Sequence, residues 1–526
     1  MSKTVDVAKA SAKGSFHYLW GLVVSTVISA VGTVFIARLL GSDLYGLYGI
    51  VLTAPNLINF FRDWGVDSAM VKFTAQYRSE NRLSEVRSVF LSGLIFEVTL
   101  GLTLAVFLFV LSDLMAATLN RPAIGPLIQI ASLMVLTNGL VKVATAAFTG
   151  MERMELNSVM IILQSVIKTV AVIGLVVLGL STSGAVIGFS ASAVVAGIIG
   201  VVFIWVLYRK LPKPPRKIEV MGYLKEMLKY GVPLSISLIL IGFLGQFFAF
   251  LLPIHYVEDN TMIANYNIAQ TFVVLIGFFA TPITTMLFPA FSKLDHQKDK
   301  ATLKNAFQSS VKYASLLVVP VAALVMSVSE PAISTLFGDI YPTAPLFLAL
   351  LAIPYIYTVI GNLSTGNLIK SQGQTTYNMK LAILTASLGF PMGYIMIMNF
   401  GVLGLIATSL TIGLPSLLIA LHWIKTNYGL TIDWRSSAKI LLSSAIAGTT
   451  TYLIVTQLPF ASWIRLAIGT AVFLIAFFTA ALFTRTITKL EINNLRAMNT
   501  GFGFLTRILD KFLNLLEKLL TIFKLA

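Results

Sequence analysis

Six ionisable side chains fall inside stretches of sequence that are otherwise apolar enough to cross a bilayer. They are three cations and three carboxylates: Arg62, Asp63, Asp67, Glu97, Lys142 and Lys168. A charge at the centre of a membrane-spanning helix costs about 2.5 kcal/mol or more, so such residues face a polar cavity or pair with one another. Three cations around one cavity suit an anionic group such as a phosphate or diphosphate, and carboxylates there are candidate carriers of a coupling ion or proton.

Mutual neutralisation is the alternative interpretation of these charges. Counting about 1.5 Å of helix per residue from the inner end of each span places Lys168 near the depth of Glu97, and Asp67 near that of Lys142. These are the ion pairs expected if the charges serve only the structure. Which of the charges face a cavity is left open at this point.

Composition places the chain among membrane proteins. Of its 526 residues, 57% are hydrophobic and only 11% are charged, with a mean hydropathy of +0.86. Soluble domains carry about 25% charged residues. The net charge of +16 would suggest nucleic acid as a partner of a soluble protein, but membrane proteins concentrate Lys and Arg in their cytoplasmic loops. We therefore expect no nucleic-acid partner.

Apolar runs long enough to cross a membrane predict an all-α integral membrane protein with fourteen transmembrane helices. The predicted spans are 15–40, 44–71, 86–112, 124–148, 156–180, 184–208, 228–255, 261–290, 307–330, 342–369, 376–400, 402–424, 438–457 and 461–486.

The distribution of positive charge orients these spans. Of the 38 Lys and Arg residues, all but six lie in the segments on one side of the predicted membrane. Only Arg38, Arg121 and Arg465 lie on the other side, and the remaining three are inside the membrane. Under the positive-inside rule, the crowded side is the cytoplasm. The sequence therefore predicts a multi-pass protein of the cell membrane with both termini cytoplasmic.

An internal repeat divides the first twelve spans into two sets of six. A shift of 218 residues without a gap lays 44–73 over 262–291, where eight of thirty positions are identical, Tyr48 with Tyr266 among them. Because six is even, both halves enter the membrane in the same orientation, and we expect two lobes related by a pseudo-two-fold axis along the membrane normal. Under the same shift Arg62, Asp63 and Asp67 align with the uncharged Ala280, Thr281 and Thr285.

The predicted organisation has five parts. They are an N-terminal lobe (1–208), a proline-rich basic cytoplasmic linker (209–222), a C-terminal lobe (223–425), two extra helices (426–488) and an amphipathic tail helix in the cytoplasmic interface (489–526). Apolar residues of this tail recur at helical spacing with Lys and Arg on the other face, which is typical of an interfacial helix; a partner-binding helix is the alternative.

Several enzyme classes lack support in this sequence. There is no Cys, the four His show no metal-ligand spacing, and no glycine-rich loop ends in Gly-Lys-Ser/Thr, the signature of a phosphate-binding ATPase. The predicted outer loops are too short for a catalytic domain. We expect no metal, no cofactor and no enzymatic activity.

Short motifs resemble the oligosaccharide flippases, the polysaccharide-transporter branch of the multidrug/oligosaccharidyl-lipid/polysaccharide exporter superfamily. The resemblance is carried by 38–48 (RLLGSDLYGLY), 63–73 (DWGVDSAMVKF) and the turn 150–153 (GMER), with 373–375 (GQT) and 401–404 (GVLG) in the second half. It covers nearly the whole chain. These motifs are mostly glycine turns, so they identify the family better than the substrate.

The resemblance implies a flippase that moves a polyprenyl phosphate or diphosphate oligosaccharide to the outer leaflet, by alternating access between the two lobes. By analogy, Arg62, Lys142 and Lys168 contact the head group, whereas Asp63, Asp67 or Glu97 couple transport to protons or Na⁺. In such relatives the two extra spans help to form a groove for the lipid tail. The chain departs from peptidoglycan-precursor flippases in having few basic residues early in its first two spans, which makes that precursor a less favoured substrate.

Other expectations and alternatives remain. The Asp-x-Gly pattern at Asp63 equally suits a structural residue at a helix end. An ion-coupled drug exporter of the same superfamily is the second transporter hypothesis, and a polyprenyl-dependent membrane glycosyltransferase is the enzyme hypothesis. We expect a monomer whose partners are lipid-linked oligosaccharide, membrane lipids and glycan-assembly enzymes.

Overall fold

The computed structural model describes residues 2–213, 219–295 and 298–489, together with a few positions between 492 and 518. Two compact units are present: unit 1 comprises Met1–Asn267 and Ala382–Thr408, and unit 2 comprises Ile268–Leu381 and Ser409–Ala526. Residues 214–218 of the predicted linker, and most of the predicted tail helix 489–526, lie outside the described residues.

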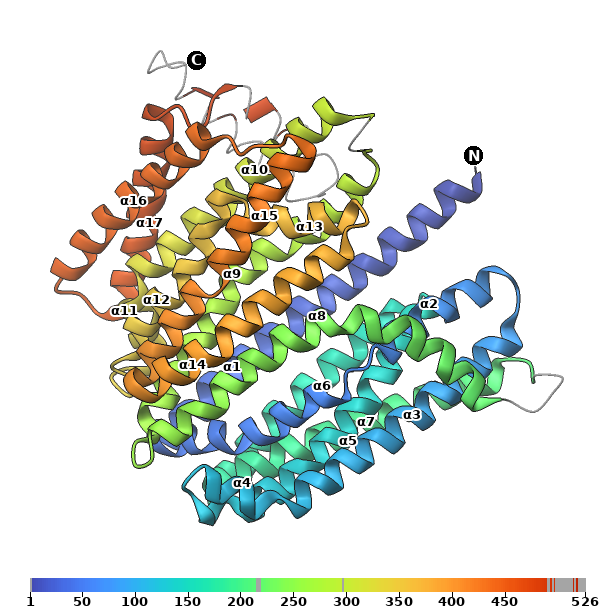
Figure 1. Ribbon diagram of the computed structural model, residues 1–526. Helices are drawn as coiled ribbons and strands as arrows, with labels where there is room; N and C mark the ends of the chain where they lie inside the picture. Colours follow the sequence, from blue (N-terminus) through green and yellow to red (C-terminus); the bar gives the residue numbers. More distant parts are fainter. Residues whose placement is uncertain are drawn as a thin grey trace. The chain divides into compact units, whose positions relative to one another are not determined.

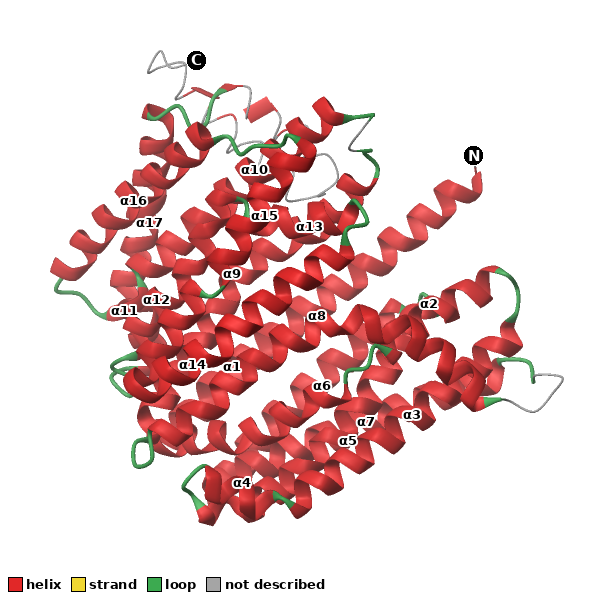
Figure 2. Cartoon of the chain, viewed as in Figure 1, coloured by secondary structure: helices red, strands yellow, loops and turns green. Residues whose placement is uncertain are grey.

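Every regular element of the described chain is helical (Figures 1 and 2). The elements are α1 (Ser2–Asn59), η1 (Phe60–Arg62), α2 (Val66–Ser79), α3 (Leu83–Val110), α4 (Ser112–Thr118), η2 (Pro122–Ile124), α5 (Gly125–Gly150), α6 (Met154–Leu175), η3 (Val176–Leu180), α7 (Ser181–Lys210), α8 (Val220–His255), α9 (Asn260–Ser292), α10 (Lys300–Ser327), α11 (Ser329–Phe337), α12 (Ala344–Ile356), η4 (Tyr357–Ile360), α13 (Asn362–Ser371), α14 (Thr375–Thr411), α15 (Gly413–Tyr428), α16 (Trp434–Gln457) and α17 (Ser462–Phe483).

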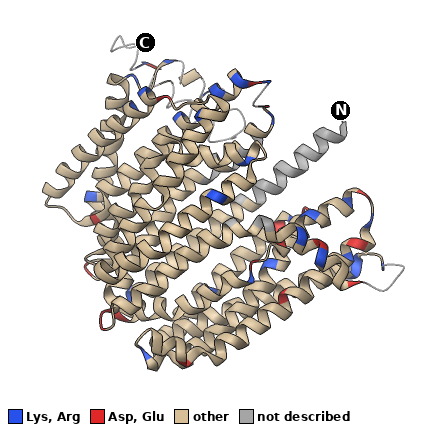
Figure 3. Ribbon diagram, viewed as in Figure 1, with Lys and Arg blue, Asp and Glu red and all other residues tan. Residues whose placement is uncertain are grey.

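Within the described residues, ten helices are long and apolar enough to cross a membrane, or eleven if α12 and α13, bent by 54° at Gly361, form one span. Charged residues are few along these helices (Figure 3). The protein is therefore a multi-pass membrane protein. Three of the ten stretches are 43, 57 and 54 residues long, whereas one crossing needs about 20, so each of these three is too long to cross only once.

Each of the three long stretches contains a glycine with positive φ, namely Gly41, Gly179 and Gly401. The chain reverses at Gly179. The contact that shows this is between Gly188 and Val172 of the preceding helix, where an added side chain would meet the Val172 backbone. At Gly401 it also reverses, since Gly404 packs against the backbone of Met396. A residue other than glycine pays a conformational cost at positive φ. Gly41 and Gly401, which belong to the family-like motifs, thus mark turns between helices, and so does Gly179.

Two hydrogen bonds, one on each side of Gly41, show that α1 turns back at this glycine. Before this glycine, Ser29 donates a hydrogen bond to Ser165 of α6 (3.2 Å). After it, the hydroxyl of Thr182 at the start of α7 donates to the carbonyl of Leu44 (3.2 Å). Because α6 and α7 are antiparallel, the two parts of α1 that pack on them are antiparallel too. Two helical hairpins therefore lie side by side within unit 1.

Small residues bring the helices of unit 1 close together. Gly21 and Gly32 of α1 face Ser158 and Thr169 of α6, and Gly200 of α7 faces Ala144 of α5. In lipid, where apolar surface gains nothing by leaving the solvent, such close approach gives the van der Waals contact that holds helices together. These contacts fix the positions of α5 and α6, which carry Lys142 and Lys168.

Two of the three basic residues on the predicted outer side are held in structural contacts. Arg465 pairs with Glu330 at 2.9 Å. Arg121 is 9% exposed and donates to the carbonyls of Pro253 (2.9 Å) and Tyr256 and to the side-chain oxygen of Asn260 (3.0 Å). Arg121 thus ties the turn after α4 to the turn between α8 and α9, which accounts for a cation on that side.

Replacing Arg121 with Ala will lower the stability of the protein by about 2–4 kcal/mol, because buried carbonyls lose a charged donor. Thermal unfolding of the purified protein measures this loss. The matched control is Arg38→Ala, an exposed arginine of α1, which should change the free energy of unfolding by less than about 0.5 kcal/mol. Equal midpoints for the two variants would show that Arg121 contributes nothing.

Candidate functional site

The second predicted span is broken where its charges lie. The helix ends in the short turn η1 at Arg62, and α2 begins only at Val66. Between them Asp63 has non-helical dihedrals, and Gly65 is left-handed with φ of 72°. Non-helical backbone within a membrane is tolerated where it is buried in protein or lines a polar cavity. Transporter binding sites are often formed by such discontinuous helices.

The second half of the repeat has no break at the corresponding place. Under the shift of 218 residues, 60–65 align with 278–283, and α9 (Asn260–Ser292) is helical throughout that range. The two aligned segments therefore differ: the second forms a continuous helix at this position, and the first an interrupted, charged one. Both the break and the charges are specific to the first half.

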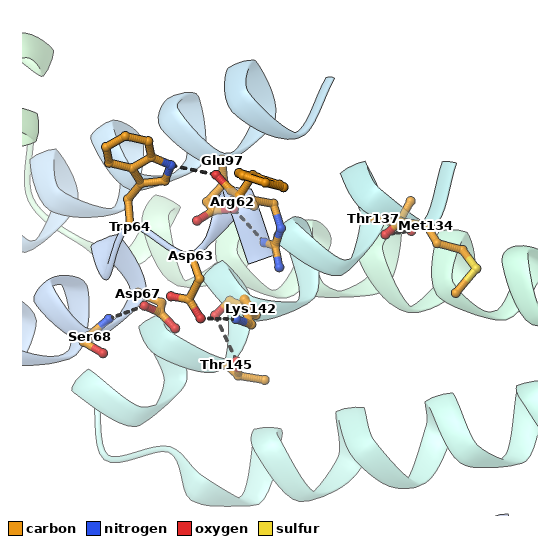
Figure 4. A network of polar contacts seen from close by, with 11 residues as sticks. Arg62, Asp63, Trp64, Asp67, Ser68, Glu97, Met134, Thr137, Lys142 and Thr145 are labelled. Carbon is orange, nitrogen blue, oxygen red and sulfur yellow. Dashed lines mark hydrogen bonds and ion pairs between the residues drawn. The ribbon is translucent and has the colours of Figure 1, made fainter. Parts of the chain in front are cut away.

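Arg62 and Glu97 form a buried ion pair. The Arg62 Nη1 lies 2.7 Å from Glu97 Oε2, and their side chains are 2% and 5% exposed (Figure 4). The Arg62 Nε is also buried and has no hydrogen-bond partner among the described residues. A buried donor without a partner costs about 1–3 kcal/mol. Arg62 therefore retains one donor without a partner among the described residues, while Glu97 neutralises its charge.

Lys142 pairs with Asp63. Its Nζ lies 3.0 Å from Asp63 Oδ2, and the two side chains are 43% and 29% exposed, so this pair is far more accessible than the first. Asp63 does not cap α2, because no side-chain capping bond is formed at its start. The helix-end role considered for Asp63 is thus not the one that its side chain performs.

The ion pairs expected from depth alone, Lys168 with Glu97 and Asp67 with Lys142, are wrong. Glu97 pairs with Arg62, and Lys142 pairs with Asp63. The expectation assumed a continuous helix through 44–71. The break at 60–65 turns the backbone, so the positions of Arg62 and Asp63 cannot be obtained by counting residues along a straight axis.

Asp67 and Lys168 are the two remaining charges. Asp67, in the first turn of α2, accepts a hydrogen bond from the backbone N–H of Ser68 (2.7 Å), and Figure 4 shows it beside Asp63 and Lys142. The Lys168 ammonium lies 5.7 Å from the centre of the Phe189 ring. Among the described residues, neither has an ion-pair partner of opposite charge. The structure thus brings five of the six predicted residues to one place. Lys168 lies apart from them, about one turn of α6 beyond Gln164.

Two cavities in unit 1 share Lys142 as a wall. The first, of about 290 Å³, is here called the Arg62 cavity, and its lining is Asn59, Phe60, Arg62, Asp63, Asn138, Val141, Lys142 and Gln164. The second, of about 390 Å³, is called the Asp67 cavity, and its lining is Tyr18, Asp67, Ser68, Val71, Lys142, Thr145, Ala146, Thr149, Met154, Asn157 and Ile161. Small-molecule sites commonly have volumes of about 300–1,000 Å³.

Uncharged polar residues of these walls were missed by the search for charges. On α5, Thr145 and Thr149 follow Lys142 at spacings of three and seven residues, and on α6 Gln164 follows Asn157 by seven. Such spacings place side chains on one face of a helix. A search for polar residues at helical spacing within apolar spans would have found them.

Gly139 on α5 makes room for the buried ion pair. A methyl group added there would lie 2.9 Å from both Arg62 Nη1 and Glu97 Oε2. We expect Gly139→Ala to destabilise the protein by about 1–3 kcal/mol, as overpacking of a buried site does, and to reduce transport. The matched control is Gly174→Ala on α6, where nothing lies within 4 Å of the added group. Unchanged thermal unfolding of the Gly139 variant would contradict the packing argument.

Residues 11–295, just over half of the chain, match the family described as polysaccharide biosynthesis protein. This range includes all six intramembrane charges. Lipopolysaccharide biosynthesis protein WzxC of Escherichia coli is 23% identical over 383 residues, which cover 71% of this chain and 73% of that protein. The sequence relationship thus extends beyond the family match into the second half.

Solved structures share the fold. The lipid II flippase MurJ, in an inward closed conformation, superposes with a TM-score of 0.69 at 17% identity, covering 89% of this chain and 98% of that one. An inward-facing multidrug resistance transporter of the MATE family gives a TM-score of 0.59 at 15% identity, covering 78% and 98%. Because the family model matches more than half of the chain, the chain belongs to the family described as polysaccharide biosynthesis protein.

Proposed function

We propose that the protein is a flippase that moves a polyprenyl phosphate or diphosphate oligosaccharide from the cytoplasmic to the outer leaflet of the cell membrane. The observation that carries this proposal is the broken helix at 60–65, which places Arg62 and Asp63 on a polar cavity together with Lys142. An interrupted, charged span beside a cavity is costly for a membrane protein and is typical of a substrate site. Membership in a polysaccharide-biosynthesis family gives the substrate class.

The cations are proposed to bind the phosphate or diphosphate. Lys142 is accessible and lines the cavity, Arg62 retains an unpartnered Nε, and Lys168 has no carboxylate partner among the described residues. An arriving phosphate would compete with Asp63 for Lys142, because both are anions. The freed carboxylate is then a candidate carrier of a proton or Na⁺, with Asp67 and Glu97 as the other candidates for coupling.

Fourteen spans with both termini cytoplasmic are proposed as the topology. Splitting the three long stretches at Gly41, Gly179 and Gly401, and counting the bent pair α12–α13 as one span, supports this number. Alternating access between two six-span lobes, 1–208 and 223–425, is proposed as the mechanism, with 426–488 as two extra helices.

The lipid tail is proposed to lie against the extra helices. An apolar cavity of about 320 Å³ in unit 2 is formed by residues of α10, α12 and α16, with Leu441, Ala445 and Tyr452 on α16. Its walls are aliphatic and aromatic with a few hydroxyl groups, which suits a prenyl chain rather than a charged group.

The drug-exporter hypothesis has support from the fold, because a multidrug transporter shares it. The lining of the Arg62 cavity holds two cations, Arg62 and Lys142, and one carboxylate, Asp63, and this excess of positive charge argues against a cationic drug as the substrate, since like charges repel in a low dielectric. The glycosyltransferase hypothesis has no comparable support, and a transporter rather than an enzyme is the better interpretation of the family.

Reconstitution into liposomes tests the proposed function. A fluorescent undecaprenyl diphosphate oligosaccharide is placed in both leaflets, and the fraction bleached by a membrane-impermeant reductant is followed with time. We expect the protein to accelerate exchange between leaflets at least tenfold over protein-free liposomes. Exchange at the protein-free rate, together with efflux of a cationic dye, would favour the drug exporter instead.

A further inference from the structure

The Asp67 cavity and the Arg62 cavity lie at different depths along the same helices. Gln164 of the Arg62 cavity is ten residues into α6, whereas Asn157 of the Asp67 cavity is three residues from its start at Met154. At about 1.5 Å per residue these distances are roughly 15 Å and 5 Å. On α5, Thr149 of the Asp67 cavity is one residue from the helix end. In the proposed topology this end is cytoplasmic, so the Asp67 cavity is the shallower one.

Polar groups in the Asp67 cavity are arranged to receive hydrogen bonds. The side chain of Asn157 is buried, 3% exposed, and its Nδ2 donates to Thr149 Oγ1 at 2.8 Å. The hydroxyl of Thr149 in turn donates to the carbonyl of Thr145 (2.7 Å). The Asn157 oxygen has no partner among the described residues. The lining therefore offers hydrogen-bond acceptors, the buried Asn157 oxygen and the Asp67 carboxylate, that a ligand rich in donors would satisfy.

A ligand of this cavity must donate hydrogen bonds without adding negative charge. A sugar presents several hydroxyl donors and apolar ring faces, and Tyr18 supplies an aromatic surface in the same lining. A second anion would be repelled by Asp67. A metal ion is less suited, because Lys142 projects a cation into the lining, and no group of three or more His, Cys, Asp or Glu among the described residues could hold one.

The order of the two cavities matches the order of groups in a lipid-linked glycan. The phosphate follows the lipid tail, and the first sugar follows the phosphate toward the water from which the molecule came. With the phosphate at the Arg62 cavity, the first sugar falls on its cytoplasmic side. Resting on the proposed function, we infer that the Asp67 cavity is the subsite for the first sugar, a neutral hexose or N-acetylhexosamine, and that Lys142 lies between the sugar and phosphate subsites.

The experiment compares two lipids, undecaprenyl diphosphate and the same lipid carrying one N-acetylglucosamine, for binding to the purified full-length protein in detergent. We expect the wild type to bind the sugar-bearing lipid about tenfold more tightly. Asn157→Leu keeps the branched shape and the number of heavy atoms of the side chain while it removes the buried acceptor; Thr149, which loses the Asn157 donor, keeps its own hydrogen bond to the carbonyl of Thr145. This variant should reduce the preference for the sugar to less than about threefold while binding the bare lipid as the wild type does.

Gln164→Leu in the Arg62 cavity is the matched control, since it should weaken both lipids by the same factor. An Asn157 variant that keeps the full tenfold preference, or that weakens both lipids equally, overturns the sugar subsite. If the wild type binds neither lipid, the proposed flippase function itself fails. A third lipid, undecaprenyl diphosphate glucuronic acid, should bind less tightly than the N-acetylglucosamine lipid, and tighter binding of the acidic sugar also overturns the inference.

Discussion

Replacing Arg62 with Gln will destabilise the protein by about 3–5 kcal/mol, because Glu97 is left as a buried charge without a counter-ion. The two side chains are 2% and 5% exposed, and their atoms are 2.7 Å apart. Glu97→Gln should have a loss of similar size, since it leaves Arg62 unpaired. The double variant, which removes both charges, should be more stable than either single variant. Thermal unfolding of the four proteins, as a double-mutant cycle, measures the coupling.

Transport by the double variant separates a structural role for Arg62 from a binding role. If Arg62 holds the phosphate through its free Nε, removing both charges restores stability but leaves transport at least about tenfold below wild type, a loss of about 1.4 kcal/mol in transition-state stabilisation. Wild-type transport by the double variant would instead assign Arg62 entirely to the fold. Additive losses in the cycle would show that the two residues do not interact.

Lys142→Ala will reduce transport by about tenfold or more while changing stability by less than about 1 kcal/mol. The side chain is 43% exposed and its partner Asp63 is 29% exposed, and accessible ion pairs of this kind contribute about 0–1 kcal/mol to folding. A phosphate bound at Lys142 loses a charge-assisted hydrogen bond in the variant. The double variant Lys142→Ala with Lys168→Ala should transport less than either single variant. The liposome exchange assay measures these rates.

Two controls accompany this prediction. Lys72→Ala removes an exposed lysine of α2 whose ammonium stacks on Tyr230 at 3.9 Å, outside both cavities, and should leave transport within about twofold. Asp63→Asn removes the partner of Lys142 but keeps the cation. It should bind undecaprenyl diphosphate at least as tightly as the wild type does. Full transport by the Lys142 and Lys168 double variant would rule out the cationic site.

The two segments that align in sequence, 44–73 and 262–291, differ in structure where the charges of the first one lie. Arg62, Asp63 and Asp67 gather at a break that the aligned helix α9 does not have. In the straight helix those positions carry an alanine and two threonines. The four charges also form two ion pairs of different accessibility, one buried and one partly exposed. The closed pair Arg62–Glu97 is a fixed part of the wall, whereas Lys142 and Asp63 can exchange partners with a ligand.

Much of the fold was predictable, because the length of an apolar run and the position of Lys and Arg residues can both be read from the sequence without knowing which helices are neighbours. Gly41 and Gly401 fall between predicted spans, whereas Gly179 lies one residue before the end of the predicted span 156–180; glycine adopts the positive φ found at all three positions at little cost. The family followed from short motifs, and the matching family model covers residues 11–295. The span 44–71 was predicted as continuous because its overall length and hydropathy suit one crossing; the Asp-x-Gly pattern at Asp63, which suits a residue at a helix end, was the local signal of the break.

By itself, the sequence determined that this is a multi-pass membrane protein and which ionisable residues stand within its apolar stretches. Only the tertiary structure decided which charges pair and which line a cavity. The physical reason is that the free-energy cost of a charge in a span depends on its depth in the membrane, which follows from its position in the sequence. Which residue it pairs with depends on the direction in which its side chain points. The break between Arg62 and Val66 changes that direction, and Gly139 on another helix leaves the space that the Arg62–Glu97 pair occupies.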